Sequence, residues 1–200
     1  MARPRKFDED DVLSASAGLF RVNGFADTST EQLCEASGLG RSSLYNTFDS
    51  KDELFVRSLE HYTAATRARQ EEILSTPDTT AAERIRMLLE AIVDEEDEAA
   101  RHDHAAGCMT VNTLMAPDHR RRDNRVDSIL SRDLQLRLDS LTSTIRMGIA
   151  DGSVTDSLTP EAGAWLVITV VSGIRVSAQA GADPPTLRRV ALAGVHALYR

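Results

Sequence analysis

Residues 28–54 constrain the fold most strongly, because they predict two short helices joined by a sharp turn. Hydroxyls at residues 28–30 can cap the start of the first helix, and Gly38 suits the left-handed conformation that often ends one. A second helix is predicted from about residue 41 to 47, and Leu44 and Phe48, four residues apart, share one of its faces. The segment therefore predicts a helix-turn-helix with an apolar anchor under its second helix.

The opposite face of this second helix carries polar side chains, those of Arg41, Ser42, Tyr45 and Asn46. A helix with its faces divided in this way can enter the DNA major groove with its polar groups outward. The Arg41 guanidinium can donate two hydrogen bonds to guanine, or it can lie along a phosphate and carry no sequence information. Asn46 can bond N6 and N7 of adenine. The pattern thus favours a DNA-reading helix.

Residues 38–54 follow the pattern Gly-Leu-x-Arg-x-Ser-Leu-Tyr-x-x-Phe-x-Ser-Lys-x-Glu-Leu. This pattern resembles the recognition helix and the following helix of the TetR/AcrR family of bacterial transcriptional regulators. The sequence similarity covers about residues 8–58. The rest of the chain resembles the family in its length, its helical content and the order of its helices. Gly40 stands where the family often has a capping Ser or Thr, and Asn46-Thr47 replaces a more frequent aromatic or His pair, which leaves the operator sequence open.

The resemblance implies an all-α fold of about nine helices. Residues 1–52 would form an N-terminal three-helix DNA-binding domain that contains the helix-turn-helix, with an arm at residues 1–7. Residues 53–200 would form a C-terminal helical ligand-binding and dimerisation domain. A chain of this kind is expected to be a ligand-responsive repressor that binds a palindromic operator as a homodimer and is released by a small-molecule effector. The sequence does not separate repressor from activator.

The residues expected to contact double-stranded DNA lie in the arm and around the two helices; they are Arg3, Arg5, Lys6, Thr30, Arg41, Ser42, Ser43, Tyr45, Asn46, Thr47 and Lys51. The arm can enter the minor groove or touch phosphates, or it can serve only as a solubilising tail. Thr30 can donate to a phosphate or act as an N-cap. Lys51 is expected in the first turn of a helix, where a cation is unfavourable unless an anion such as a phosphate compensates.

The charge of the chain gives less support than the motif. Formal net charge is −8, and residues 1–55 are acidic on balance, whereas proteins that bind DNA through phosphates usually present a basic patch. The alternative is a helical ligand-binding or interaction protein with a non-functional helix-turn-helix. An enzyme is not expected, because the sequence has no nucleophile elbow, no phosphate-cradling Gly loop and no paired carboxylates in an apolar segment.

No cofactor, metal or membrane partner is expected either. His102-Asp103-His104 lacks further ligands at metal-site spacing, so a solvated helix end is favoured over a metal site. No run of eighteen apolar residues exists, and residues 164–174 are interrupted by polar side chains and glycine. The N-terminus leads into the acidic residues 8–11 rather than an apolar core. We therefore expect a cytoplasmic protein.

Helical patterns continue to the C-terminus. They predict helices at about residues 8–23, 50–74, 126–149 and 160–180, others from residue 80 and over residues 187–198, and a basic surface loop at residues 117–123. Residues 107–115 resemble the sixth helix of one subgroup of the family. Its methionines suit an adaptable cavity wall or plain core, and Asn112 suits a polar handle for a ligand or a satisfied core amide. The candidate ligand-binding residues are Met87, Cys108, Met109, Asn112, Met115, Trp165 and Ile168, and few of them are polar, which favours an uncharged, fairly apolar ligand.

The predicted helix up to residue 180 is apolar on more than one face, so it must be covered on both sides, and the final predicted helix has one apolar face. We expect them to pair with the same helices of a second chain, which would form a four-helix interface. The candidate interface residues are Val170, Ile174, Leu187, Val190, Gly194 and Leu198. The alternative is that these residues belong to the core of a monomer.

Overall fold

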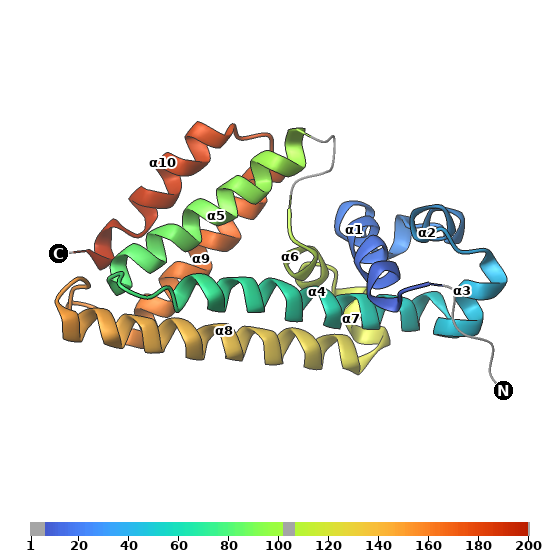
Figure 1. Cartoon of the computed structure of the whole chain (residues 1–200), viewed down its shortest axis with the longest axis horizontal. Helices are drawn as coiled ribbons and strands as arrows, with labels where there is room; N and C mark the ends of the chain where they lie inside the picture. Colours follow the sequence, from blue (N-terminus) through green and yellow to red (C-terminus); the bar gives the residue numbers. More distant parts are fainter. Residues whose placement is uncertain (1–6, 102–106, 200) are drawn as a thin grey trace. The chain divides into compact units, whose positions relative to one another are not determined.

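The computed structural model describes residues 7–101 and 107–199, and within these ranges the fold is all-α, as predicted (Figure 1). The helices, in chain order, are α1 (Glu9–Asp27), α2 (Thr30–Ser37), α3 (Arg41–Phe48), α4 (Lys51–Leu74), α5 (Ala81–Arg101), α6 (Met109–Leu114), α7 (Pro117–Arg122), α8 (Asn124–Asp151), α9 (Pro160–Gln179), α10 (Pro184–Gly194) and the 3-10 helix η1 (His196–Leu198). The prediction of a basic surface loop at residues 117–123 is wrong. This segment contains the short helix α7, which Pro117 begins at the position where a missing N–H costs nothing.

The chain divides into two compact units. The first consists of the described residues of Met1–Ala65 and Cys108–Leu130, and the second of those of Thr66–Gly107 and Ser131–Arg200. The first unit thus extends beyond the residue-52 boundary suggested by the sequence and includes a second segment. The reason lies in its core, because Met109, Val126 and Leu130 are buried among apolar residues of α1 to α4.

Helix α1 is broken near its C-terminal end, where Gly24 has φ 72° and ψ 177°. Glycine adopts positive φ without the steric cost that other residues incur. The break turns the chain so that the Phe25 ring lies 6.3 Å from the Phe20 ring and 5.3 Å from the Phe55 ring, centroid to centroid. The three aromatic rings fill the space between α1 and α4 in the first unit, as expected for Phe25.

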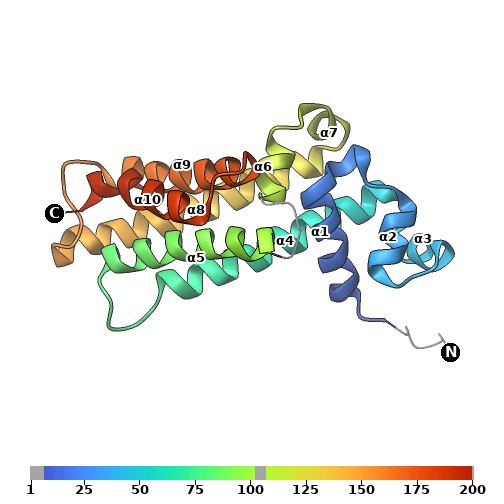
Figure 2. The same ribbon diagram turned by 90° about the horizontal axis from the view of Figure 1, so that it is seen from above.

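In the second unit, α5, α9 and α10 lie side by side (Figures 1 and 2). Ile85, Leu89 and Ile92 of α5 are buried against apolar residues of α9 and α10. This core also contains charge, because Arg175 of α9 is buried and forms ion pairs with Glu95 and Glu96 of α5. The second oxygen of the Glu96 carboxylate accepts a hydrogen bond of 2.7 Å from the backbone N–H of Gly107.

A second charged contact joins the C-terminal half of α4 to α8. The carboxylate of Asp133, 2% exposed, lies 3.4 Å from a guanidinium nitrogen of Arg67 and 2.7 Å from one of Arg137. Arg137 also donates a hydrogen bond of 2.9 Å to the hydroxyl of Thr66. Two cations around one buried carboxylate offset the desolvation of its charge.

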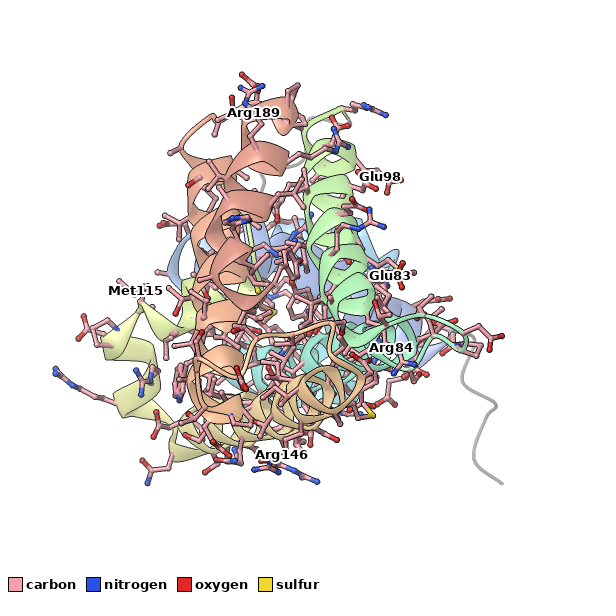
Figure 3. All side chains as sticks on the ribbon, turned by 90° about the vertical axis from the view of Figure 1, so that its left-hand side faces the viewer. Glu83, Arg84, Glu98, Met115, Arg146 and Arg189 are labelled. Carbon is pink, nitrogen blue, oxygen red and sulfur yellow. The ribbon has the colours of Figure 1, made fainter. Side chains whose placement is uncertain are left out.

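Helix starts in the second unit carry the caps that the sequence predicts. At α5, the Thr80 N–H donates to the Glu83 carboxylate and the Glu83 N–H donates to the Thr80 hydroxyl, a reciprocal capping box (Figure 3 labels Glu83). At α9, the Thr159 hydroxyl accepts from the Ala162 N–H, and Pro160 is the first helical residue.

Helix α9 has the length and mean hydropathy of a membrane-spanning helix, the one such helix among the described residues. The same properties occur in core helices of soluble proteins, and α9 packs against α5 and α10. It also contains the buried Arg175 and its two carboxylate partners, a contact between helices of one folded unit. These contacts identify α9 as a core helix of the second unit.

Candidate nucleic-acid interface

Helices α2 and α3 form the predicted helix-turn-helix. The Ser29 hydroxyl caps α2 and the Gln32 side chain returns a bond to the Ser29 N–H, which makes a capping box. Gly38 ends α2 in the left-handed conformation at φ 66°. Helix α3 then begins after Gly40 with no side-chain cap, as the departure from the family pattern suggests. Ser29, rather than Thr30, is therefore the N-cap.

The apolar anchor of α3 is present as predicted. Leu44 and Phe48 are 1% and 0% exposed and lie in the core of the first unit. Their burial fixes the rotation of α3 about its axis, so that the remaining side chains point away from the core. Arg41, Ser42, Ser43 and Asn46 are exposed, and Tyr45 and Thr47 are partly exposed. Helix α3 thus presents a continuous polar surface of six predicted DNA-binding residues.

Two of these side chains are held by hydrogen bonds within the protein. The Tyr45 and Thr30 hydroxyl oxygens lie 2.7 Å apart, which links α3 to the first residue of α2. The Thr47 hydroxyl donates to the Ser43 carbonyl oxygen at 2.9 Å, within α3 itself. Thr30 is therefore part of the interface surface through Tyr45. No sequence pattern indicates this pairing, which spans fifteen residues.

The Arg41 guanidinium lies close to two other side chains. It lies 3.5 Å from the Glu31 carboxylate of α2 and 5.9 Å from the centroid of the Tyr45 ring. The second contact has the geometry of a cation–π interaction. Sequence reasoning did not single out Glu31. A carboxylate in the first turn of α2 is an ordinary helix feature, and only the fold brings it to Arg41.

Lys51 is the first residue of α4, as predicted, and its ammonium lies 4.5 Å from the centroid of the Phe25 ring. Partial burial lowers the pKa of Lys51, whereas the carboxylates of Asp52 and Asp27 act in the opposite direction. The ring and the two carboxylates thus offset part of the cost of a cation in the first turn of α4. Arg3, Arg5 and Lys6 of the predicted arm lie outside the described residues.

Four of the predicted ligand-binding residues belong to the first unit, and each has a different environment. Met109 is fully buried in the core of that unit, and Met115 is 76% exposed. The Cys108 sulfur accepts a hydrogen bond from the Tyr62 hydroxyl at 3.6 Å. The Asn112 amide donates a hydrogen bond of 2.8 Å to the Arg21 carbonyl oxygen of α1. These contacts favour core and linking roles for Met109 and Asn112.

The other three predicted ligand-binding residues, Met87, Trp165 and Ile168, belong to the second unit. Trp165 is half exposed and Ile168 packs against the core. A hollow of about 50 Å³ lies between α5 and α10, too small for a typical small-molecule site. Its lining consists of Leu89, Glu90, Val93, Arg188, Ala191 and Leu192, none of which was predicted.

Three of the six predicted interface residues are buried within their own unit. Ile174, Leu187 and Leu198 are no more than 2% exposed and pack in the core of their own unit, whereas the interface prediction stays a prediction. Gly194 lies against Val170, where an added Cβ would be 2.7 Å from a Val170 methyl carbon. The outward side chains of this helix pair are Trp165, Val176, Val190 and Leu192.

A metal site was not expected, and the described ranges contain no group of three or more His, Cys, Asp or Glu side chains suited to a metal ion. His102, Asp103 and His104 lie outside those ranges.

The sequence of the chain is similar to those of known bacterial regulators. The model of the bacterial regulatory proteins of the tetR family matches residues 12–57, which include α2 and α3. The HTH-type transcriptional repressor ComR of Escherichia coli is 25% identical over 195 residues, covering 94% of this chain and 88% of ComR. The repressor BdcR of Escherichia coli is 31% identical over 125 residues, 60% of this chain and 59% of BdcR, so this alignment spans less than two thirds of that relative.

Solved structures extend the similarity over nearly the whole chain. The TetR family transcriptional regulator CifR, a cysteine mutant complexed with double-strand operator DNA, has a TM-score of 0.81 at 28% identity, covering 98% of this chain and 99% of CifR. Reduced NemR of Escherichia coli shares the fold, with a TM-score of 0.78 at 20% identity. The N-terminal helices of the chain thus match the model of the TetR family of bacterial regulators, and almost its full length is similar to CifR, a regulator of that family.

Proposed function

We propose that the protein is a transcriptional repressor that binds a palindromic operator as a homodimer and is released by a small-molecule effector. The observation that carries the proposal is α3, whose polar surface is held outward by the buried Leu44 and Phe48. A solved structure of the relative CifR contains operator DNA, which supports the same partner here. The protein would act in the cytoplasm, where its DNA target lies.

In the proposed complex, α3 lies in the major groove. Arg41 at its start reads guanine, and Asn46, one turn and a half further along, reads adenine. Ser42 and Ser43 are short enough for close approach to the DNA. The Thr30–Tyr45 pair and Lys51 flank α3 and are suited to phosphate contacts, which position a reading helix without specifying sequence. The arm residues Arg3, Arg5 and Lys6 would add contacts outside the groove.

Homodimer formation is supported by the outward apolar surface of α9 and α10. Trp165, Val176 and Val190 are 50–51% exposed there, although apolar side chains gain from burial. A dimer would place two copies of α3 about 34–36 Å apart, one turn of DNA. Val190→Asp should therefore yield monomers by native mass spectrometry, and Val22→Asp, at an exposed valine of α1, should leave the dimer intact. Dimers in both variants would count against this surface.

The effector would be an uncharged, fairly apolar molecule bound by some of the residues predicted from the sequence. Coupling between effector and DNA binding of about 1–3 kcal/mol would give a switch of about 5- to 150-fold. A thermal-shift screen against candidate metabolites, followed by DNA release in the presence of each hit, tests this part. A hit that stabilises the protein without weakening DNA binding would argue for a different role.

A gel-shift assay on the DNA that flanks the gene tests the proposal as a whole. Arg41→Ala should weaken binding by about 5- to 150-fold, because it removes a two-bond guanine contact. Tyr45→Phe, which removes the hydroxyl paired with Thr30, should weaken binding less. Arg132→Ala, at an exposed arginine of α8, is the control for lost charge. Full affinity in both α3 variants would refute the assignment of α3 and favour the alternative, a helical interaction protein.

A further inference from the structure

Glu31 lies on the proposed DNA-binding surface, although a carboxylate there should repel phosphates. It is the second residue of α2, its side chain is 76% exposed, and its carboxylate lies 3.5 Å from the guanidinium of Arg41. The Arg41 side chain is itself 68% exposed. An ion pair so exposed contributes little to folding. As a first-turn carboxylate Glu31 suits the start of α2, and its contact with Arg41 can serve a role beyond folding.

Arg41 has a second neighbour that fixes its direction. The Tyr45 ring lies under the guanidinium, and the Tyr45 hydroxyl is tied to Thr30, the residue before Glu31. Two residues of α2 and two of α3 thus form one connected cluster, which we call the Glu31 cluster (Thr30, Glu31, Arg41 and Tyr45). In it, the guanidinium lies between a carboxylate and an aromatic ring.

We propose that Glu31 is a specificity-determining residue, which competes with phosphates for Arg41 and so weakens binding to non-operator DNA. The inference rests on the proposed function. Non-specific binding depends almost entirely on phosphate contacts. An exposed ion pair is worth up to about fivefold in an equilibrium, comparable to one such contact. A two-bond contact to guanine strengthens binding by about 5- to 150-fold. Guanine in the operator can therefore displace Glu31 from Arg41, whereas a single phosphate cannot.

The acidic balance of the N-terminal region agrees with this role. Residues 1–55 are acidic on balance, so each cation of this region matters for binding to arbitrary sequence, and competition for Arg41 should have a measurable effect. Glu35 provides a matched control. Glu35 lies one turn further along α2 and is also exposed, but the ion-pair partner of Arg41 is Glu31.

The test measures binding to a mixed-sequence DNA duplex by fluorescence anisotropy at several salt concentrations. Glu31→Gln should raise the affinity about two- to fivefold and steepen the slope of log K against log salt by about one. Glu35→Gln should change both quantities less. The decisive variant is the double change Glu31→Gln with Arg41→Ala, which should bind no better than Arg41→Ala alone, because Glu31 acts through Arg41.

The same variants are then measured on the fragment that gives the gel shift. Glu31→Gln should lower the ratio of operator to mixed-sequence affinity by about two- to fivefold. An equal gain from Glu31→Gln with and without Arg41, or an unchanged ratio, would show that Glu31 acts only as general negative charge and would overturn the inference while leaving the proposed function intact. Failure of the unmodified protein to bind any DNA would overturn both.

Discussion

Asn112 should stabilise the first unit through a single hydrogen bond. Its side-chain amide, on α6, donates to the Arg21 carbonyl oxygen of α1 at 2.8 Å. Arg21 lies three residues before the break at Gly24, and the last carbonyls of a helix have no intrahelical donor. The amide of Asn112 therefore takes the place of the N–H group that a continuous helix would have supplied. Asn112→Ala removes this donor and should destabilise the protein.

The size of the effect follows from the position of the bond. Arg21 and Asn112 are both partly buried, so water replaces the lost donor only in part. Leaving a carbonyl unsatisfied in such a place costs about 1–3 kcal/mol. In a protein of 150–250 residues each 1 kcal/mol shifts the melting temperature by about 2–4 °C, so Asn112→Ala should lower it by about 2–12 °C. Asn112→Asp should cost more, because a carboxylate would face the carbonyl oxygen without a proton to donate.

Thermal and urea unfolding of the purified variants measure this difference. Asn124→Ala, at the exposed first residue of α8, is the matched control and should change the melting temperature by less than about 2 °C, as is usual for surface changes. Hydrogen exchange should also show faster exchange of the amides in α1 near the break in Asn112→Ala. An unchanged melting temperature in Asn112→Ala, or equal losses in Asn112→Ala and Asn124→Ala, would refute the reasoning.

Three further changes test the second unit. Gly194→Ala should cost about 1–3 kcal/mol in thermal unfolding, because its Cβ would be 2.7 Å from Val170, whereas the same change at Gly173, which has open space, should cost nothing. Arg175→Ala leaves a buried carboxylate unpaired and should cost about 3–5 kcal/mol in urea unfolding, with a smaller loss contradicting the ion pair. Hydrogen bonds from Ser153 lower the pKa of Asp151, so the stability it contributes is present above the ordinary value of 3.8 and is lost as the pH falls through the lower folded value. Asp151→Asn should therefore flatten the decline of melting temperature in acid, and an unchanged decline would contradict this role.

Features set by local sequence were predictable. The Ser29 and Thr159 caps, the left-handed Gly38 and the four-residue spacing of Leu44 and Phe48 depend on neighbours within one or two turns, and each has the expected consequence in the structure. The family pattern carried the same information, because it lies in this short segment.

Features set by contacts between distant helices were not predictable. Helix α9 is apolar on more than one face, and periodicity does not tell which face meets its own core. Ile174 is thus buried within the subunit, whereas Val176, two residues on, is half exposed. Periodicity also did not indicate that α6 joins the first unit, so a ligand handle was predicted for Asn112, with a satisfied amide as the alternative. The structure favours the satisfied amide over the ligand handle.

The interruption of α1 has a consequence for how this sequence diverges. Gly24 creates the acceptor that Asn112 uses, although the two positions lie far apart in the chain. A descendant that replaces the glycine would straighten the first helix and withdraw that acceptor, and the amide would then lose its selective value. We expect the two positions to co-vary among orthologues, with neither retained for long after the other is lost.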